Sequence, residues 1–213
     1  MKARFTAPVT AIVGLIILAA LFRFGRTEAF GDRYLLVNML GLFLAPMLVI
    51  FLVFRSDPGE FGFSLGDSRR VARFTVILYL LTLLPLILAS QMKSFQQHYP
   101  ISRDASASVG TFLYFEATYG MCLLCREFFF RGFLLFGLAR AIGWGAIFFQ
   151  AAGYGLMHYG RSAPEFAASF VAGLVLGWVA LRAKSFVPSF LLHWALAVTF
   201  DAMVIGGARF VGG

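Results

Sequence analysis

The sequence predicts an all-α fold, a multi-pass transmembrane bundle of about seven helices. Of its 213 residues 60% are hydrophobic and only 13% are charged, and the mean hydropathy is +0.83. Apolar runs close to the roughly 20 residues that cross a bilayer recur along the whole chain. The polar connections between them are too short for a water-soluble second domain. We therefore expect one membrane domain, residues 1–213, in the plasma (inner) membrane.

The apolar runs and the turn residues between them place the helices. Pro58, Gly59 and their charged neighbours mark an extramembrane loop, residues 93–108 form the longest polar connection, and Gly143 and Gly145 mark a turn. Two further glycines, Gly173 and Gly177, are spaced i, i+4 and predict a small-residue packing face. The expected helices cover about 8–24, 34–54, 71–92, 109–139, the stretch from the 143–145 turn to 158, 165–181 and 189–205.

The formal charge of +8 does not indicate nucleic-acid binding. The basic residues are scattered over short loops, as in membrane proteins whose cations contact lipid headgroups, and no basic stripe or recognition motif accompanies them. We therefore expect the lipid bilayer as a partner and no nucleic acid. Cys122 and Cys125 form a lone C-x-x-C within a predicted helix, without a second pair of ligands, and are expected to be packing residues.

A charged cluster interrupts the apolar sequence of the fourth predicted helix. It contains Arg126, Glu127 and Arg131. Charges at membrane depth are costly, so they persist when they pair or serve a site. Glu127 and Arg131 are spaced i, i+4, at which a carboxylate and a guanidinium meet on a helix. The cluster alone is equally consistent with an ion pair that fixes helix packing.

Two histidines extend this cluster into a candidate site. His158 closes the fifth predicted helix and His193 lies inside the seventh, whereas His98 belongs to a polar loop. Glu127 and His158 lie at similar distances before and after the turn near Ile142, which places them at similar depth on adjacent antiparallel helices. A carboxylate and two imidazoles can activate a water and stabilise an oxyanion. The same three side chains could instead bind a divalent metal such as zinc.

These residues resemble the motifs of the CPBP family (CAAX protease and bacteriocin-processing, also called ABI) of intramembrane glutamic-type endopeptidases. The family pattern is Glu-Glu-x-x-x-Arg, then Phe-x-x-x-His, then His-x-x-x-Asn or Asp. The corresponding stretches here are Arg126-Glu127-x-x-x-Arg131, Tyr154-x-x-x-His158 and His193-x-x-x-Ala197. Their order and spacing are retained over roughly residues 112–197, and the CPBP-like core is expected at about 108–205.

The resemblance implies a function and a role for each residue. Glu127 and His158 would activate the water that attacks a peptide bond, His193 would donate to the oxyanion, and Arg131 and Arg126 would surround and support these groups. The implied substrate is a membrane protein or lipidated peptide, cleaved near its terminus. The resemblance implies no cofactor, and a zinc site of Glu127, His158 and His193 ranks below a metal-free mechanism.

Two departures from the family pattern leave an alternative open. Arg126 replaces the first glutamate and cannot accept a proton. Ala197 offers no donor where the family has asparagine; Asp201, two turns beyond His193, could compensate only in part, and Glu116 is too far along the helix to replace the missing glutamate. The alternative is a degenerate relative that binds a peptide or partner without cleaving it. A small transporter built on the same cluster is a third hypothesis.

Overall fold

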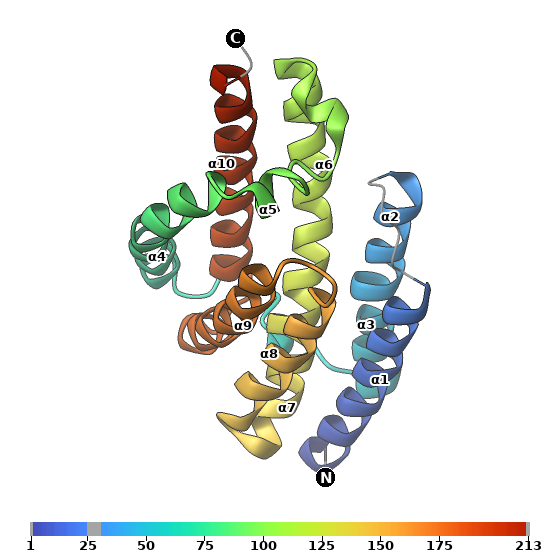
Figure 1. Ribbon diagram of the computed structural model, residues 1–213. Coiled ribbons are helices and arrows are strands. Elements are labelled where there is room, and N and C mark those ends of the chain that lie inside the picture. Colours follow the sequence, from blue (N-terminus) through green and yellow to red (C-terminus); the bar gives the residue numbers. More distant parts are fainter. Residues whose placement is uncertain (1, 25–30, 212–213) are drawn as a thin grey trace.

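The computed structural model is a bundle of α-helices (Figure 1) and describes residues 2–24 and 31–211. Within these two ranges no residue lies in a β-strand, which confirms the predicted fold class. Seven long helical segments make up the described part of the chain: α1 (Lys2–Phe24), α2 to η2 (Asp32–Phe54), α4 (Ser68–Ser90), α6 to α7 (Val109–Ile142), α8 (Gly145–Met157), α9 (Ala163–Ala183) and α10 (Val187–Val211).

Shorter elements subdivide or connect these segments. The second segment consists of α2 (Asp32–Val37), η1 (Asn38–Leu44), α3 (Ala45–Leu48) and η2 (Val49–Phe54), and the fourth of α6 (Val109–Glu127), η5 (Phe128–Leu134) and α7 (Leu135–Ile142). Single turns of helix occupy the connections: η3 (Pro58–Phe61), α5 (Lys93–Gln96) and η4 (Arg103–Ser106).

Five segments within the described ranges are long and apolar enough to cross a membrane, which makes this an integral membrane protein: 5–23, 32–54, 68–90, 163–183 and 187–207. Two of the seven predicted helices do not meet this criterion. The α6–α7 segment is long but carries the charged cluster, and α8 has only 13 residues, about 20 Å of helix against a hydrocarbon core of about 30 Å. Which membrane holds the protein stays a prediction.

The fourth segment carries the site and is continuous from Val109 to Ile142. Ser108 starts it with a capping box, in which its hydroxyl accepts the Thr111 N–H at 3.1 Å and the Thr111 hydroxyl accepts the Ser108 N–H at 3.0 Å. The middle of the segment, η5, is wound as a π-helix and all seven of its residues are buried. π-helical turns inside α-helices occur frequently at functional sites.

Small residues bring α8 and α9 together, as the glycine spacing predicted. A Cβ at Gly173 would lie 2.9 Å from the Cα of Ala151, and one at Gly177 would lie 2.5 Å from the Gln150 amide nitrogen. Gln150 uses this closeness, because its amide donates to the Gly173 carbonyl at 2.7 Å across the helix pair. The contact holds α8, and therefore its last residues, in a fixed position against the rest of the bundle.

Candidate active site

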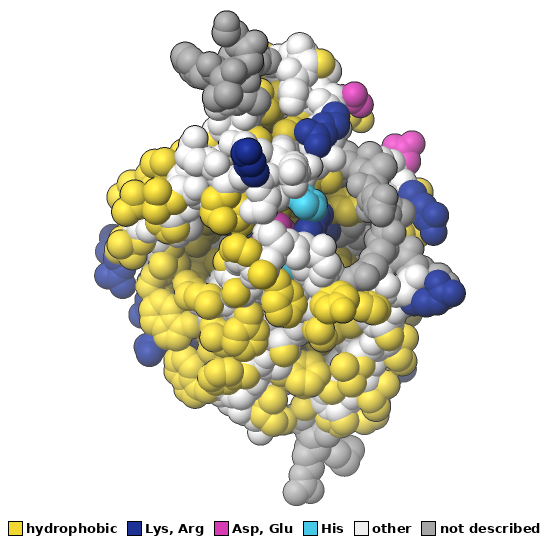
Figure 2. All heavy atoms as spheres, in the orientation of Figure 1, with side chains coloured by type: hydrophobic (Ala, Val, Ile, Leu, Met, Phe, Trp, Pro, Cys, Tyr) yellow, Lys and Arg dark blue, Asp and Glu magenta, His cyan; other side chains and the backbone are white. Residues whose placement is uncertain are grey.

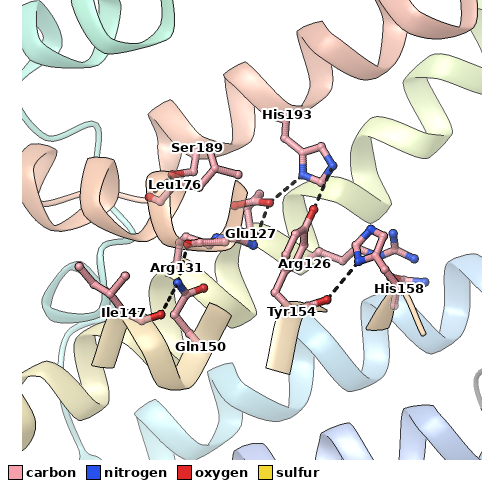
Figure 3. A network of polar contacts seen from close by, with 12 residues as sticks. Arg126, Glu127, Arg131, Ile147, Gln150, Tyr154, His158, Leu176, Ser189 and His193 are labelled. Atoms are coloured by element: carbon pink, nitrogen blue, oxygen red, sulfur yellow. Dashed lines mark hydrogen bonds and ion pairs between the residues drawn. The ribbon is translucent and has the colours of Figure 1, made fainter. Parts of the chain in front are cut away.

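Glu127 forms the centre of a buried polar network (Figure 3). It is the last residue of α6 and is fully buried. One carboxylate oxygen, Oε1, accepts hydrogen bonds from the Arg131 guanidinium at 3.2 Å and from His193 Nδ1 at 2.8 Å. The i, i+4 partner expected from the sequence is therefore in contact with the acid, and a histidine from α10 joins it.

Packing between α6 and α10 places His193 opposite the acid. The neighbouring Trp194 donates its indole N–H to the backbone carbonyl of Glu116 at 2.9 Å. Gly120 makes room for the indole ring, since a Cβ there would lie 2.7 Å from it. These contacts fix the register of the two helices one residue away from His193.

The interior side of the network is buried. The guanidinium of Arg131 is fully buried and lies 4.0 Å from the centre of the Tyr154 ring, a cation–π contact. The second carboxylate oxygen of Glu127 and two of the Arg131 nitrogens have no hydrogen-bond partner among the described residues. The Glu127 carboxylate has no exposed surface in this structure.

Tyr154 of α8 connects the two histidines. Its hydroxyl lies 3.4 Å from His193 Nε2, and its backbone carbonyl lies 3.1 Å from His158 Nδ1. Its ring centre is 4.9 Å from that of His158 and 6.1 Å from that of His193. The family motif has phenylalanine at this position, and Tyr154 keeps the aromatic ring. The additional hydroxyl is the sequence signal that indicates a polar role.

The bonding partners determine the ring protons of both histidines. A carbonyl and a carboxylate only accept, so Nδ1 carries the proton in His158 and in His193. In the neutral ring Nε2 is then the basic nitrogen. His193 Nε2 accepts from the Tyr154 hydroxyl, whereas His158 Nε2 has no hydrogen-bond partner among the residues described. His158 therefore keeps a free basic nitrogen.

His158 faces a cavity of about 480 Å³, a volume within the range of small-ligand sites. Figure 2 shows a histidine side chain in a hollow on one face of the molecule, with a basic side chain next to it. The cavity is also lined by Tyr34, Arg126, Tyr154, Arg161 and Glu165. No hydrogen bond joins His158 to Glu127 in the described structure. The two residues predicted to activate water together are thus separated by Tyr154, and the acid bonds to His193 instead.

Arg126 points away from the acid next to it in the chain. Its Nε donates to the side-chain oxygen of Asn38 at 3.1 Å, its Nη2 donates to the Tyr34 hydroxyl, and the guanidinium carbon lies 5.3 Å from the centre of the Tyr34 ring. Asn38 is itself buried and donates to the Tyr34 carbonyl at 2.7 Å. Sequence reasoning missed both partners, although Asn38 is a polar residue within an apolar run.

Asp201 does not take the place of the missing third-motif donor. It is buried on α10, as Glu116 is on α6, and the carboxylate oxygens of both residues have no hydrogen-bond partner among the described residues. Neither residue lines the cavity. Ala197 leaves its side of the site without a side-chain donor.

The described residues contain no group of three His, Cys, Asp or Glu side chains placed to hold a metal ion. Glu127, His158 and His193, the ligands named for a zinc site, use one carboxylate oxygen and both Nδ1 atoms in bonds to protein groups. Cys122 and Cys125 are free thiols buried in two apolar clusters, as expected of packing residues.

Comparison with known proteins identifies the segment that carries this network. Residues 108–199 match the family model described as Type II CAAX prenyl endopeptidase Rce1-like. No curated protein and no solved structure matches the sequence significantly. The matched range contains Arg126, Glu127, Arg131, His158 and His193 in family order. Over residues 108–199, this chain is similar to the family of type II CAAX prenyl endopeptidases that are Rce1-like.

Proposed function

We propose that this protein is an intramembrane endopeptidase that cleaves a membrane-associated or lipidated protein near its terminus. The observation that carries the proposal is the position of His158. Its ring lines the cavity, and its Nε2 has no hydrogen-bond partner among the described residues. Tyr154 connects it to the Glu127–His193 network. The family match supports a protease in general terms. Substrate class, cleavage position and residue roles are part of the proposal.

The proposed reaction begins with a water in the cavity. His158 Nε2 takes one proton from the water as its oxygen bonds to the scissile carbonyl carbon, and the carbonyl oxygen becomes an oxyanion. The His158 imidazolium then gives that proton to the leaving amine as the C–N bond breaks. In this step Glu127 holds His193 as the imidazolium, so that His193 Nε2–H donates to the Tyr154 hydroxyl oxygen and the hydroxyl proton is free to donate to the oxyanion.

Glu127 thus acts through His193 in this scheme rather than on the water itself, because its carboxylate is fully buried. No metal takes part in the proposed steps. Metal analysis of the purified protein, followed by a cleavage assay after dialysis against a chelator, tests that part of the proposal. A stoichiometric metal whose removal abolishes cleavage would contradict it.

A second candidate function is peptide binding without cleavage. Three observations favour it: Arg126 stands where the family has a glutamate, Ala197 provides no donor, and Glu127 has no exposed surface. Loss of a single oxyanion donor lowers rates by about 10² to 10³. Under this hypothesis the cavity holds a peptide whose bonds remain intact.

A cleavage assay with two substitutions separates the candidates. His158→Ala removes the proposed base, and Glu127→Gln removes the charge that supports His193. We expect each to lower the cleavage rate by about 100-fold or more at unchanged protein abundance. Glu60→Gln is the matched control, because Glu60 is an exposed acid that pairs with Arg140 of α7 and does not line the cavity. Comparative proteomics of C-terminal peptides, in a deletion strain against the Glu127→Gln strain, identifies the substrate. Processing that persists unchanged in both variants would remove the enzyme hypothesis.

A further inference from the structure

Arg126 is a cation on the wall of the cavity without an acidic partner. Both groups that its guanidinium contacts, the Asn38 amide oxygen and the Tyr34 hydroxyl, are neutral. No ion pair joins Arg126 to a carboxylate among the described residues. A partly buried guanidinium that lacks a counter-charge is unfavourable, so this site is favourable to an anion.

The acids near Arg126 are already in use. Glu127 shares its charge between Arg131 and His193. Glu165, the acid that lines the cavity, accepts from the Tyr99 hydroxyl at 2.8 Å and lies 4.0 Å from Arg161. With each of these carboxylates matched by another arginine, the positive charge of Arg126 is the one left over in this part of the described structure.

The geometry of Arg126 also suits an anion. Two of its nitrogens, Nε and Nη2, are held by partners from the second helical segment, which fixes the plane of the guanidinium. Nη1 has no hydrogen-bond partner in the described residues, and the side chain lines the same cavity as His158. A planar guanidinium held in this way is a specific binding group for a carboxylate.

We propose that Arg126 binds the free C-terminal carboxylate of a peptide that occupies the cavity. The proposal rests on the proposed function only in that the cavity receives a peptide, cleaved or not. It gives a reason for a guanidinium at this position, since it would orient the peptide with its C-terminal end beside His158. A carboxylate bound there would neutralise the unbalanced charge and limit the site to peptides that end close to the bond next to His158.

The test is a binding cycle with two peptides that differ only at the C-terminus. A prenylated, fluorescein-labelled peptide is prepared with a free carboxylate and as the carboxamide, and equilibrium binding to the His158→Ala protein is measured by fluorescence anisotropy in nanodiscs of neutral lipid. We expect the carboxamide to bind about ten- to a hundredfold more weakly, the range that charge-assisted hydrogen bonds give. Adding Arg126→Gln should remove the difference, and Arg126→Lys should retain part of it.

Arg161→Gln is the matched control, because Arg161 lines the same cavity but has an acidic neighbour. It should leave the discrimination between the peptides intact. Equal binding of both peptides, binding of neither, or discrimination that disappears with Arg161→Gln and survives Arg126→Gln would each overturn the proposal. So would loss of the discrimination when phosphatidylglycerol is added to the nanodiscs, since a lipid headgroup would then be the anion. The unmodified protein is also tested for cleavage of both peptides. If it cleaves neither, while the discrimination still depends on Arg126, the result supports this inference and contradicts the endopeptidase.

Discussion

The site has an inner wall, formed by Glu127, Arg131 and His193, and a cavity wall, formed by Arg126 and His158. Each wall holds one arginine from the same helical segment, and the surroundings of the two arginines differ. Arg131 is fully buried and bonds to a carboxylate. Arg126 is partly buried, lines the cavity and bonds only to neutral oxygens. In Figure 3 the two side chains leave the segment on different sides of Tyr154.

The difference teaches that burial decides what an arginine requires. In the buried interior an isolated charge is very costly, so Arg131 and Glu127 depend on each other. Beside a cavity, water or a ligand can solvate the cation, and neutral acceptors suffice. The inner wall therefore holds a paired charge that contacts His193, whereas the cavity wall holds a cation without a carboxylate partner among the described residues.

The largest effect is expected from removing the inner arginine. Arg131→Met leaves the Glu127 carboxylate buried with only His193 as a partner, and we expect it to reduce the free energy of unfolding by about 3–5 kcal/mol. Arg126→Met removes two hydrogen bonds from a charged donor, which contribute about 1.5–3 kcal/mol each, but it also removes a cation without a counter-charge, so we expect the smaller net loss. Thermal unfolding of both variants in the same detergent measures the difference.

A double variant shows whether the unpaired charge is the cause. Replacing both partners of a buried ion pair by apolar residues of similar size is often neutral or stabilising. Glu127→Leu combined with Arg131→Met should therefore unfold at a temperature close to that of the unmodified protein, while cleavage stays absent. If the double variant is as unstable as Arg131→Met alone, lost packing rather than charge explains the effect.

The sequence predicted the inner wall better than the cavity wall. Hydrophobic runs of membrane-spanning length gave the helices, and the i, i+4 spacing gave the contact between Glu127 and Arg131, because both depend on local geometry along one segment. The neighbours of Arg126 could not be found this way. Tyr34 and Asn38 lie about 90 residues earlier in the chain, so only the packing of the second segment against α6 brings them to it.

The role of Tyr154 was predictable from the sequence only in part. Its place in the motif was evident from the sequence, but the motif position predicts a ring and gives no reason for a hydroxyl. The arrangement of α8 against α10 places that hydroxyl at His193, where it joins the inner wall to the cavity. A residue whose function depends on one atom beyond the motif can be assigned only when its neighbours are known.

Tyr154→Phe removes the hydroxyl that connects the two walls, and we expect its effect on the cleavage rate rather than on the free energy of unfolding. The ring remains and keeps its contact with Arg131, so folding should be unchanged. Because the proposed scheme makes this hydroxyl the oxyanion donor, its loss should lower the cleavage rate by about 10²- to 10³-fold. Rates measured with Tyr159→Phe, an exposed residue of the same cavity, give the control. A cleavage rate that Tyr154→Phe leaves unchanged would mean that the hydroxyl does not stabilise the oxyanion.

The smallest effect is expected at an ion pair on the surface, which also joins a guanidinium to a carboxylate. Arg140 of α7 donates to Glu60 at 2.7 Å, and the two side chains are 34% and 45% exposed. The distance is shorter than the 3.2 Å between Arg131 and Glu127, yet water solvates both partners when the contact is broken. Glu60→Gln should therefore lower the free energy of unfolding by less than about 1 kcal/mol.

The response to salt distinguishes the two ion pairs more clearly than the size of their effects on the free energy of unfolding does. At about 1 M salt the screening length falls to roughly 3 Å, so the effect of Glu60→Gln should vanish. The effect of Arg131→Met should persist, because buried pairs are screened much less by salt and the Arg131 guanidinium is fully buried. Unfolding of both variants and the unmodified protein at low and high salt measures this. If salt reduced both effects equally, water would reach Glu127, and the carboxylate could then act on the cavity water directly instead of through His193.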